Sequence, residues 1–424
     1  MAEIIDQRAR RILFVERTTW LGGSTVSLDG LLQGLDARSY QPLILTRPSN
    51  AFRHKWEKLG EVILEDMGLS GQVGHGRRDI AGALKRASPT TGRLYLQVRD
   101  FVTFLGRDRV VARRLAPLLA NRKIDLIHNN NGLPFDRATV TAGWLARVSQ
   151  VCHFRAFTPL SPVDRWLARR VQSHICVSEA VKQYFVHQGI PERSLHVVYN
   201  PIDLDAFSTV TDVAKTRKGL GLRDSDLVVT NVGRLDWWKG HDVFLKAIAE
   251  LKPRWPDIRA LVVGDCGPTR RSMDYCEQLR RITAQLGLQD TVVFAGVRQD
   301  IPAVMAASDV LVHSATEPEP LGRVVMEGMA AGRPVIATAA GGVKEIIKDG
   351  ETGMLVPPAS SDAIVNTVDL LLREPLVRNR ISQKAQAYAR EHFSIQKHWE
   401  SVQRIYQLVT ELPPKRVEKQ GILE

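Results

Sequence analysis

Short apolar runs alternate with longer segments of helical periodicity along most of the chain. The runs end in glycine or polar residues, as buried parallel strands do. They lie at residues 11–15, 42–45, 62–64, 124–128, 151–155, 174–178, 227–232, 260–265, 292–298, 309–313 and 335–337. Segments such as 26–35, 362–372 and 395–409 repeat apolar residues at helical spacing. This alternation predicts an α/β fold with parallel, doubly wound sheets that bind ligands at the carboxyl ends of their strands.

The most informative stretch runs from residue 313 to 347 and reads HSATEPEPLGRVVMEGMAAGRPVIATAAGGVKEII. We predict a loop that carries Glu319, a helix with Pro320 in its first turn, and a short buried strand. A turn at Gly341 and Gly342 then opens another helix. The apolar stripe of the first helix is formed by Leu321, Val325, Gly328 and Met329.

The start of this helix suits an anion, because free N–H groups and the helix dipole attract phosphate. Glu327 follows Gly322 by five residues, roughly 7–8 Å along a helix axis. That is about the distance from a pyrophosphate to the ribose of the same nucleotide, and a carboxylate accepts two ribose hydroxyls well. Glu319 would lie on the other side of the phosphates, where a sugar would be. The two glutamates therefore predict a grip on both ends of a nucleotide sugar.

At these residues the chain resembles the retaining glycosyltransferases of family GT4, also called glycosyl transferase group 1, which have the GT-B fold. Glu319, seven residues and Glu327 match the family's E-x7-E motif, and the surrounding Glu-Pro-Leu-Gly and Glu-Gly-Met-Ala-Ala-Gly-Arg-Pro match as well. The resemblance implies two Rossmann-like domains facing across a cleft. The first would bind the acceptor and the second the nucleotide sugar, with Glu319 on the sugar hydroxyls and Glu327 on the ribose.

A loop after the strand at 227–232 carries two cations five residues apart, Arg234 and Lys239. Arginine offers a planar fork of donors and lysine a point charge, which together suit a diphosphate. The loop resembles the family's G-R…K-G segment, whose two cations hold the leaving nucleotide diphosphate. Further donor-site candidates implied by the resemblance are Gly264, Val297, Arg298, Leu321, Gly322 and Arg323.

In the first half, Gly22 and Gly23 follow the first strand and precede a helix, where a phosphate or substrate can approach closely. The G-x-G-x-x-G spacing of a classical dinucleotide site is absent. His128, His153 and Arg155 end their strands, so we expect them to point at the ligand-binding edge. Relatives carry a histidine near the end of the strand at 151–155, and either His153 or Arg155 could take its place.

Composition narrows the class of protein. The 424 residues are 44% hydrophobic and 25% charged, which is typical of a globular chain of two domains. The chain contains no run of 18 or more apolar residues, so we expect no membrane-spanning helix. The first residues lack the apolar core of a secretion signal. The cysteines form no CxxC or CxH pattern, so we expect them to be reduced. They are Cys152, Cys176, Cys266 and Cys276.

Charge is uneven along the chain. The formal net charge is +12, and residues 1–200 hold all of it, with 29 Lys/Arg against 17 Asp/Glu. Residues 77–123 hold 12 Lys/Arg against 3 Asp/Glu, a balance of +9, around an apolar stripe at helical spacing. The stripe is Leu94, Val98, Phe101 and Leu105, and the basic residues around it are Arg93, Arg99, Arg107, Arg109, Arg113 and Arg114. A basic amphipathic segment can lie on an anionic bilayer, and an ordinary surface helix with an apolar core face is the alternative. No motif favours nucleic acid.

We therefore predict an acceptor-binding domain at residues 1–200, a nucleotide-sugar-binding domain at 201–392, a helix at 393–412 that crosses back to the first domain, and a tail at 413–424. The predicted activity is metal-independent hexosyl transfer with retention, from a UDP- or GDP-type sugar and without a cofactor. A lipid-linked saccharide in cell-surface polysaccharide synthesis is the expected acceptor, at the cytoplasmic face of the plasma membrane. The alternatives are a nucleotide-sugar epimerase and a transferase with a soluble acceptor.

Overall fold

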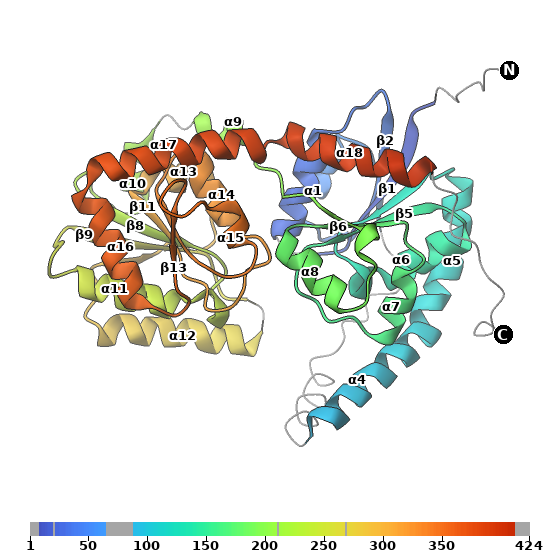
Figure 1. The fold of residues 1–424 in the computed structure, drawn as a ribbon, viewed down its shortest axis with the longest axis horizontal. Coiled ribbons are helices and arrows are strands. Elements are labelled where there is room, and N and C mark those ends of the chain that lie inside the picture. Colours follow the sequence, from blue (N-terminus) through green and yellow to red (C-terminus); the bar gives the residue numbers. More distant parts are fainter. Residues whose placement is uncertain (1–7, 20–21, 65–87, 210–211, 268, 412–424) are drawn as a thin grey trace. The chain divides into compact units, whose positions relative to one another are not determined.

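A computed structural model describes residues 8–19, 22–64, 88–209, 212–267 and 269–411 of the chain (Figure 1). The chain divides into two compact units, which we call unit 1, residues 1–199 and 398–424, and unit 2, residues 200–397. The sequence predicts boundaries after residues 200 and 392. The predicted tail and part of the basic segment lie outside the described residues. Among the described residues, no helix combines the length and the apolar character that crossing a bilayer requires.

Unit 1 contains a parallel sheet of seven strands. The strands are β1 (Arg10–Glu16), β2 (Tyr40–Thr46), β3 (Glu61–Leu64), β4 (Leu126–Asn129), β5 (Ser149–Phe154), β6 (Ser173–Cys176) and β7 (Leu195–Val197). Their order is β3-β2-β1-β4-β5-β6-β7, so the direction of winding reverses between β1 and β4. At such a switch point the loops leave the two strands toward opposite sides and open a crevice at the carboxyl ends.

Helices cover both faces of this sheet. They are α1 (Gly23–Gln33), α2 (Arg53–Trp56), α4 (Pro89–Thr103), the π-helical turn η1 (Phe104–Asp108), α5 (Arg109–Asn121), α6 (Leu133–Leu145), α7 (Pro162–Ala168), α8 (Glu179–His187), the 3-10 turn η2 (Glu192–Ser194) and α18 (Ile395–Glu411). The alternation along β1 divides the core, because Ile12 and Phe14 pack with residues of α1 and α18. Leu13 and Val15 face the other way and pack with residues of α5 and α6.

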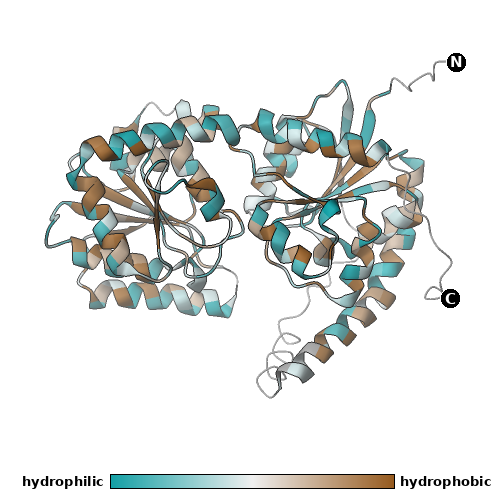
Figure 2. Ribbon diagram, in the orientation of Figure 1, coloured by the Kyte–Doolittle hydropathy of each residue, from teal (hydrophilic) through white to brown (hydrophobic). Residues whose placement is uncertain are grey.

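Unit 2 contains a second parallel sheet, with the order β10-β9-β8-β11-β12-β13 and a switch point between β8 and β11. Its strands are β8 (Leu227–Val232), β9 (Ile258–Val263), β10 (Val292–Phe294), β11 (Val310–His313), β12 (Val335–Thr338) and β13 (Met354–Val356). Its helices are α9 (Leu204–Ser208), α10 (Val213–Gly219), η3 (Trp237–Lys239), α11 (His241–Leu251), α12 (Arg270–Gln285), α13 (Ile301–Ala307), α14 (Arg323–Ala330), α15 (Val343–Ile346), α16 (Ser361–Arg373) and α17 (Pro375–His392). Figure 2 shows that the strands are apolar while the helices are apolar on one side only.

The structure confirms the eleven predicted strands with shifts of a few residues at their ends. It corrects the start of the helix after Glu319, which begins at Arg323. Gly322, with φ of 87°, is the cap of α14, and this left-handed conformation cannot continue a helix. Pro320 therefore lies in the preceding loop. The sequence analysis did not predict the edge strands β7 and β13, which have three residues each.

The prediction of four reduced cysteines is wrong for two of them. Cys266, in the loop after β9, forms a disulfide with Cys276 on α12. The two lie ten positions apart in the sequence, a spacing that matches no short motif, and the turn from the strand into the helix brings them together. Cys152 and Cys176 are free and buried in the sheet of unit 1.

The expectation that His128 and His153 point at the ligand-binding edge is also wrong. Both side chains are fully buried on the face of the sheet that α18 covers. The Nδ1 atom of His128 lies 2.6 Å from the Tyr406 hydroxyl, and the rings of His128 and His153 lie 5.6 Å apart. The ring of His398 stacks on that of His153 at 6.5 Å. These histidines are therefore part of the core, whatever else they do.

We expect unit 1 to lose stability in mild acid. Burial, with a contribution from the nearby Arg155 guanidinium, holds the pKa of both His128 and His153 well below 6.5. The unfolded chain binds protons at these residues below about pH 6.5 while the folded chain does not, so the free energy of unfolding falls as the pH falls. Each histidine contributes up to about 1.4 kcal/mol per pH unit.

Urea unfolding between about pH 7 and pH 5.5 measures this loss, and hydrogen exchange of β4 and β5 assigns it to unit 1. His153→Gln should flatten the pH dependence. His54→Gln is the matched control, since the His54 side chain is 85% exposed. An equal slope in the wild type and His153→Gln would contradict the assignment.

Candidate functional site

The loops after β8 and β11 flank the switch point of unit 2 and carry the strongest candidates. The loop after β8 holds Arg234 and ends in the 3-10 turn η3, whose last residue is Lys239. The loop after β11 holds Glu319. The Ser314 hydroxyl donates to the Gly240 carbonyl at 2.9 Å and so ties the two loops together. Residues 80 positions apart in the sequence thus meet at one end of the sheet.

Lys239 and Glu319 form an ion pair at this point, with Nζ 2.6 Å from Oε2. The Nε2 atom of His313, at the end of β11, lies 3.4 Å from the same carboxylate oxygen. Lys239 Nζ also lies 4.3 Å from the centre of the Trp238 ring, a cation–π contact. Both side chains of the ion pair are less than a sixth exposed. The cation and the carboxylate predicted from separate motifs are thus direct neighbours.

The ion pair fixes the charge of Glu319. Burial raises the pKa of its carboxyl, but the Lys239 ammonium and the His313 ring lower it more, to about 2. Glu319 is therefore ionised at every pH near neutrality. It can accept hydrogen bonds from hydroxyls, and it cannot act as a general acid there.

Arg234 lies in the same loop with its side chain 54% exposed. Its Nη2 atom lies 3.1 Å from Asp236 Oδ2, and the other Asp236 oxygen accepts from the Ser272 hydroxyl at 2.6 Å. Ser272 is on α12, within the segment that the Cys266–Cys276 disulfide closes. Asp236 therefore aims the exposed guanidinium while α12 holds Asp236.

Glu327 lies on α14, one turn after Arg323, and its Oε1 accepts from Arg323 Nε at 2.8 Å. Arg323 Nη1 also donates to the Pro201 carbonyl at 2.9 Å. Burial raises the pKa of the Glu327 carboxyl, and Arg323 offsets this only in part. Glu327 can therefore gain from further donors, such as two hydroxyls. Leu321, before the helix, is buried.

The other candidates of unit 2 lie at the carboxyl ends of neighbouring strands. Gly264 follows β9, and its N–H donates to the Gly296 carbonyl after β10 at 2.8 Å. Val297 and Arg298 follow in that turn, and Val297 is 63% exposed. Arg298 is held by Asp300 at 2.5 Å. All the candidates predicted for unit 2, except those on α14, therefore lie at the carboxyl edge of its sheet.

Glycine permits the closest backbone approach at this edge. Gly341 has φ of 63° and forms a β-bridge with Glu319 in the loop after β11. A Cβ atom on Gly341 would lie 2.1 Å from the Glu319 carbonyl oxygen. The Gly342 N–H donates to the same oxygen at 2.9 Å. The turn after β12 therefore holds the backbone of Glu319 in place.

The first-half candidates lie at the carboxyl edge of the sheet in unit 1. Gly22 caps α1, and a Cβ atom on Gly23 would meet nothing within 4 Å, so no neighbour among the described residues accounts for glycine there. Arg155 follows β5 directly, with Nη2 2.7 Å from Asn130 Oδ1 and 3.0 Å from His153 Nδ1. Arg155 is thus the group at the strand end, while His153 lies in the core beneath it. Their catalytic roles stay predictions.

Sequence reasoning missed four residues that hold these candidates. His313 and Asp236 contact Glu319 and Arg234, and Asn130 and Glu16 contact each other beside Arg155. A signal existed for two of them. Glu16 is an acidic residue at the end of an apolar strand, and Asn130 belongs to a run of three asparagines after the next strand in the sheet. No sequence signal marks His313 or Asp236 as a partner.

Two family models match the chain. The model described as glycosyl transferases group 1 matches residues 212–388, and glycosyltransferase family 4 matches residues 21–206. The GDP-mannose-dependent alpha-(1-6)-phosphatidylinositol monomannoside mannosyltransferase of Mycolicibacterium smegmatis is 31% identical over 66% of this chain and 76% of its own length. A D-inositol 3-phosphate glycosyltransferase of Mycobacterium sp. (strain JLS) is 36% identical over 48% of this chain, which spans 45% of that relative.

Solved structures give the same architecture over almost the whole chain. HepE of Anabaena in complex with UDP and glucose superimposes with a TM-score of 0.75 and 25% identity, covering 93% of this chain and 99% of that one. Sucrose-phosphate synthase of Thermosynechococcus elongatus, at 19% identity and a TM-score of 0.72, covers 95% and 99% and shows the fold alone. The predicted two-domain GT-B fold is confirmed.

The turn at Gly341 offers a test of how tightly the site is held. Gly341→Ala should destabilise unit 2 and displace Glu319, because the new Cβ would overlap a carbonyl oxygen. Gly350→Ala is the matched control, since Gly350 has φ of 71° and open space around it. The left-handed conformation alone costs alanine about 1–2 kcal/mol in both variants. Thermal unfolding should show a clearly larger loss for Gly341→Ala, and equal losses would show that the overlap is relieved without cost.

Proposed function

Because this chain belongs to the glycosyl transferases of group 1, we propose that it transfers a hexose from a UDP- or GDP-type sugar to an acceptor hydroxyl with retention of configuration. The Lys239–Glu319 ion pair at the switch point of unit 2 is the observation that carries this proposal. In the proposed roles Lys239 binds the diphosphate and Glu319 binds the sugar, and this contact supports both because the two side chains are direct neighbours. Two named likenesses support the donor class, one GDP-mannose-dependent and one bound to UDP and glucose.

In the proposed complex the diphosphate lies between Arg234, Lys239 and the start of α14. These groups stabilise the negative charge that grows on the leaving phosphate, and this replaces a metal ion. Glu319 accepts hydrogen bonds from the sugar hydroxyls, and Glu327 accepts from the ribose. The turn with Gly264, Val297 and Arg298 lines the base. The glycine turn at Gly22 and Gly23 in unit 1 is proposed to contact the acceptor.

The proposed reaction proceeds on one face of the sugar. The bond between the anomeric carbon and the phosphate oxygen breaks, and the acceptor oxygen bonds to the same face. The acceptor proton passes to the leaving phosphate oxygen, so no protein carboxylate needs to act as a nucleophile. Glu319 suits this scheme because it stays ionised and is held by Lys239.

We propose a lipid-linked saccharide as the acceptor, for cell-surface polysaccharide synthesis. One relative is named as a phosphatidylinositol monomannoside mannosyltransferase, which supports this class of acceptor. The structure supplies a surface suited to a membrane, formed by helix α4 and the turn η1 that follows it. Their exposed apolar residues follow one helical face and are 36–62% exposed: Leu94, Val98, Phe101, Val102 and Leu105. An apolar stripe of this kind marks an interaction surface.

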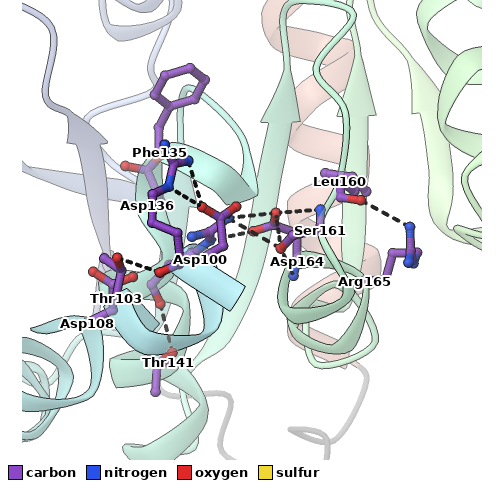
Figure 3. Close-up of polar contacts among 12 residues, drawn as sticks. Asp100, Thr103, Asp108, Phe135, Asp136, Thr141, Leu160, Ser161, Asp164 and Arg165 are labelled. Atoms are coloured by element: carbon purple, nitrogen blue, oxygen red, sulfur yellow. Dashed lines mark hydrogen bonds and ion pairs between the residues drawn. The ribbon is translucent and has the colours of Figure 1, made fainter. Parts of the chain in front are cut away.

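The opposite face of α4 is fixed to unit 1 by a partly buried ion network (Figure 3). Arg137 Nη2 donates to Asp100 on α4 at 2.9 Å, and Arg137 Nε donates to Asp164 on α7 at 2.6 Å. The helix extends from the sheet of unit 1 while it stays anchored (Figure 1). Beyond η1, Arg113 and Arg114 of α5 are exposed. An anionic bilayer complements this combination of apolar and basic side chains, so we propose that α4 and α5 dock on the cytoplasmic face of the plasma membrane.

A donor panel with a transfer assay tests the function. Thermal shifts against nucleoside diphosphates and their sugars should identify the donor, because a bound ligand raises the apparent stability. Transfer to a lipid-linked acceptor should then continue in EDTA. Lys239→Ala should lose most of the rate, since its charge matters most as the diphosphate leaves. Loss of activity in EDTA with rescue by Mn²⁺ would contradict the metal-free mechanism. Epimerised donor in the absence of acceptor would indicate the epimerase alternative.

The two glutamates should separate affinity from turnover. Glu327→Ala should weaken binding of the free nucleoside diphosphate, whereas Glu319→Ala should lower kcat and leave that affinity nearly unchanged. Each loss should be about 1.5–3 kcal/mol, typical of a hydrogen bond to a charged group. Calorimetric titration and steady-state kinetics measure the two effects. Glu317→Ala, exposed in the same loop as Glu319, is the control. Equal losses of affinity in both variants would refute the assignment.

Membrane docking predicts salt-sensitive binding to anionic liposomes. Reversing Arg113 and Arg114 to Glu should abolish co-sedimentation, because each basic residue near an anionic surface contributes about 1 kcal/mol. Reversing the exposed Lys58 and Arg193 makes the same change in charge elsewhere on unit 1 and should have little effect. Phe101→Ser should weaken binding without changing its salt dependence. Equal binding to anionic and neutral liposomes would favour a soluble acceptor.

A further inference from the structure

The switch point of unit 1, between β1 and β4, holds a buried carboxylate that none of the roles above uses. Glu16, the last residue of β1, is fully buried. Its Oε1 atom accepts from the Thr18 N–H at 2.9 Å, the Thr18 hydroxyl at 2.6 Å and Asn131 Nδ2 at 2.9 Å. Its Oε2 atom accepts from Asn130 Nδ2. Four donors thus surround a carboxylate at the position where a doubly wound sheet binds its ligand.

The chain of contacts from Glu16 has a fixed direction. Arg155 donates from Nε and Nη2 to Asn130 Oδ1, at 3.1 and 2.7 Å. An ionised carboxylate can only accept and a guanidinium can only donate, so the Asn130 amide has one orientation that satisfies both ends. Arg155 Nη2 also lies 3.0 Å from His153 Nδ1, which must then accept as a neutral ring. Glu16, Asn130, Arg155 and His153 form one polarised row.

Asn130 and Thr18, the partners of Glu16, also contact the first turn of α1. Asn130 Nδ2 also donates to the Ser24 carbonyl at 3.2 Å, and the Thr18 and Thr25 hydroxyls lie 2.9 Å apart. Ser24 and Thr25 follow Gly22 and Gly23 in the first turn of α1. Glu16 therefore ties the glycine turn of unit 1 to Arg155.

We propose that Glu16 is a positioning residue, which sets Arg155 and the start of α1 through Asn130 and so shapes the acceptor side of the reaction. This inference rests on the proposed function, in which unit 1 binds the acceptor. Glu16 meets no substrate itself, because it is fully buried and its two oxygens are occupied by protein donors. The charge of Glu16 instead orients the Asn130 side-chain amide, which in turn accepts from Arg155 at the end of β5.

Glu16→Gln tests this at one contact. The glutamine Oε1 can keep the three donors of the present Oε1, but its NH2 group would oppose the NH2 group of Asn130. If Asn130 turned over, its NH2 group would oppose the Arg155 guanidinium instead. The acceptor kcat/KM should fall by about 10- to 100-fold, while the Kd of the donor nucleotide stays unchanged.

Asp29→Asn is the matched control for removing a buried charge from unit 1. Asp29 is 5% exposed, and it accepts from Lys55, Trp56 and Gln33. The double variant Glu16→Gln with Asn130→Asp should recover part of the acceptor kcat/KM. In this variant the introduced glutamine amide donates to the introduced aspartate, which still accepts from Arg155, although the contact with Ser24 is not remade.

A second measurement does not depend on turnover. The Nε–H signal of Arg155, assigned through Arg155→Lys in ¹⁵N-arginine-labelled protein, should shift and exchange faster in Glu16→Gln than in Asp29→Asn. An unchanged Arg155 signal, or equal acceptor kcat/KM in Glu16→Gln and Asp29→Asn, would overturn the proposal. If the wild type transfers sugar to no acceptor, the proposed function fails, and the Arg155 signal alone then decides whether Glu16 positions it.

Discussion

The reversal of strand order inside each sheet is the constraint on which both sites depend. Two parallel strands whose connections leave in opposite directions open a gap at their carboxyl ends, and the side chains beside it need partners from across the gap. In unit 2 the partners are Lys239 after β8 and Glu319 after β11. In unit 1 they are Glu16 at the end of β1 and Asn130 after β4. The contact across the switch point is therefore an ion pair in unit 2 and a carboxylate–amide hydrogen bond in unit 1.

Each candidate charged group of unit 2 already has a partner of opposite charge within the protein. A buried carboxylate costs several kcal/mol unless a cation or strong donors accompany it. Glu319 has Lys239 and His313, Arg234 has Asp236, and Glu327 has Arg323. A diphosphate would share Lys239 and Arg234 with these carboxylates, and the sugar hydroxyls would donate to the oxygens that remain. The free protein can therefore keep its charged groups in place without a ligand.

The sequence predicts the central strands well because each is an apolar run that helices cover on both faces. It also identifies Glu319 and Glu327 as site candidates, because the E-x7-E motif is defined by short-range spacing. It does not predict His313 beside Glu319, or Asp236 beside Arg234, because those contacts depend on how the loops fold. The sequence also gives a wrong expectation at a strand end, where a shift of two positions changes whether a side chain is buried or lies at the ligand-binding edge. His153 and Arg155 are two positions apart at a strand end, yet one enters the core and the other lies at the edge. Cys266 and Cys276 show the same difficulty, since only the turn into α12 brings them together.

The path of α18 has a consequence for the order in which the molecule is made. Trp399, Val402, Ile405, Tyr406 and Val409 of this helix belong to the same apolar cluster as Ile12 and Phe14 of β1. The whole of unit 2, residues 200–397, lies between them and the rest of unit 1 in the chain. During synthesis the first half therefore leaves the ribosome with one face of its sheet covered by α1 but not by α18, and that face stays incomplete until all of unit 2 has been translated. The part of the protein that is made first is thus the last to complete its core.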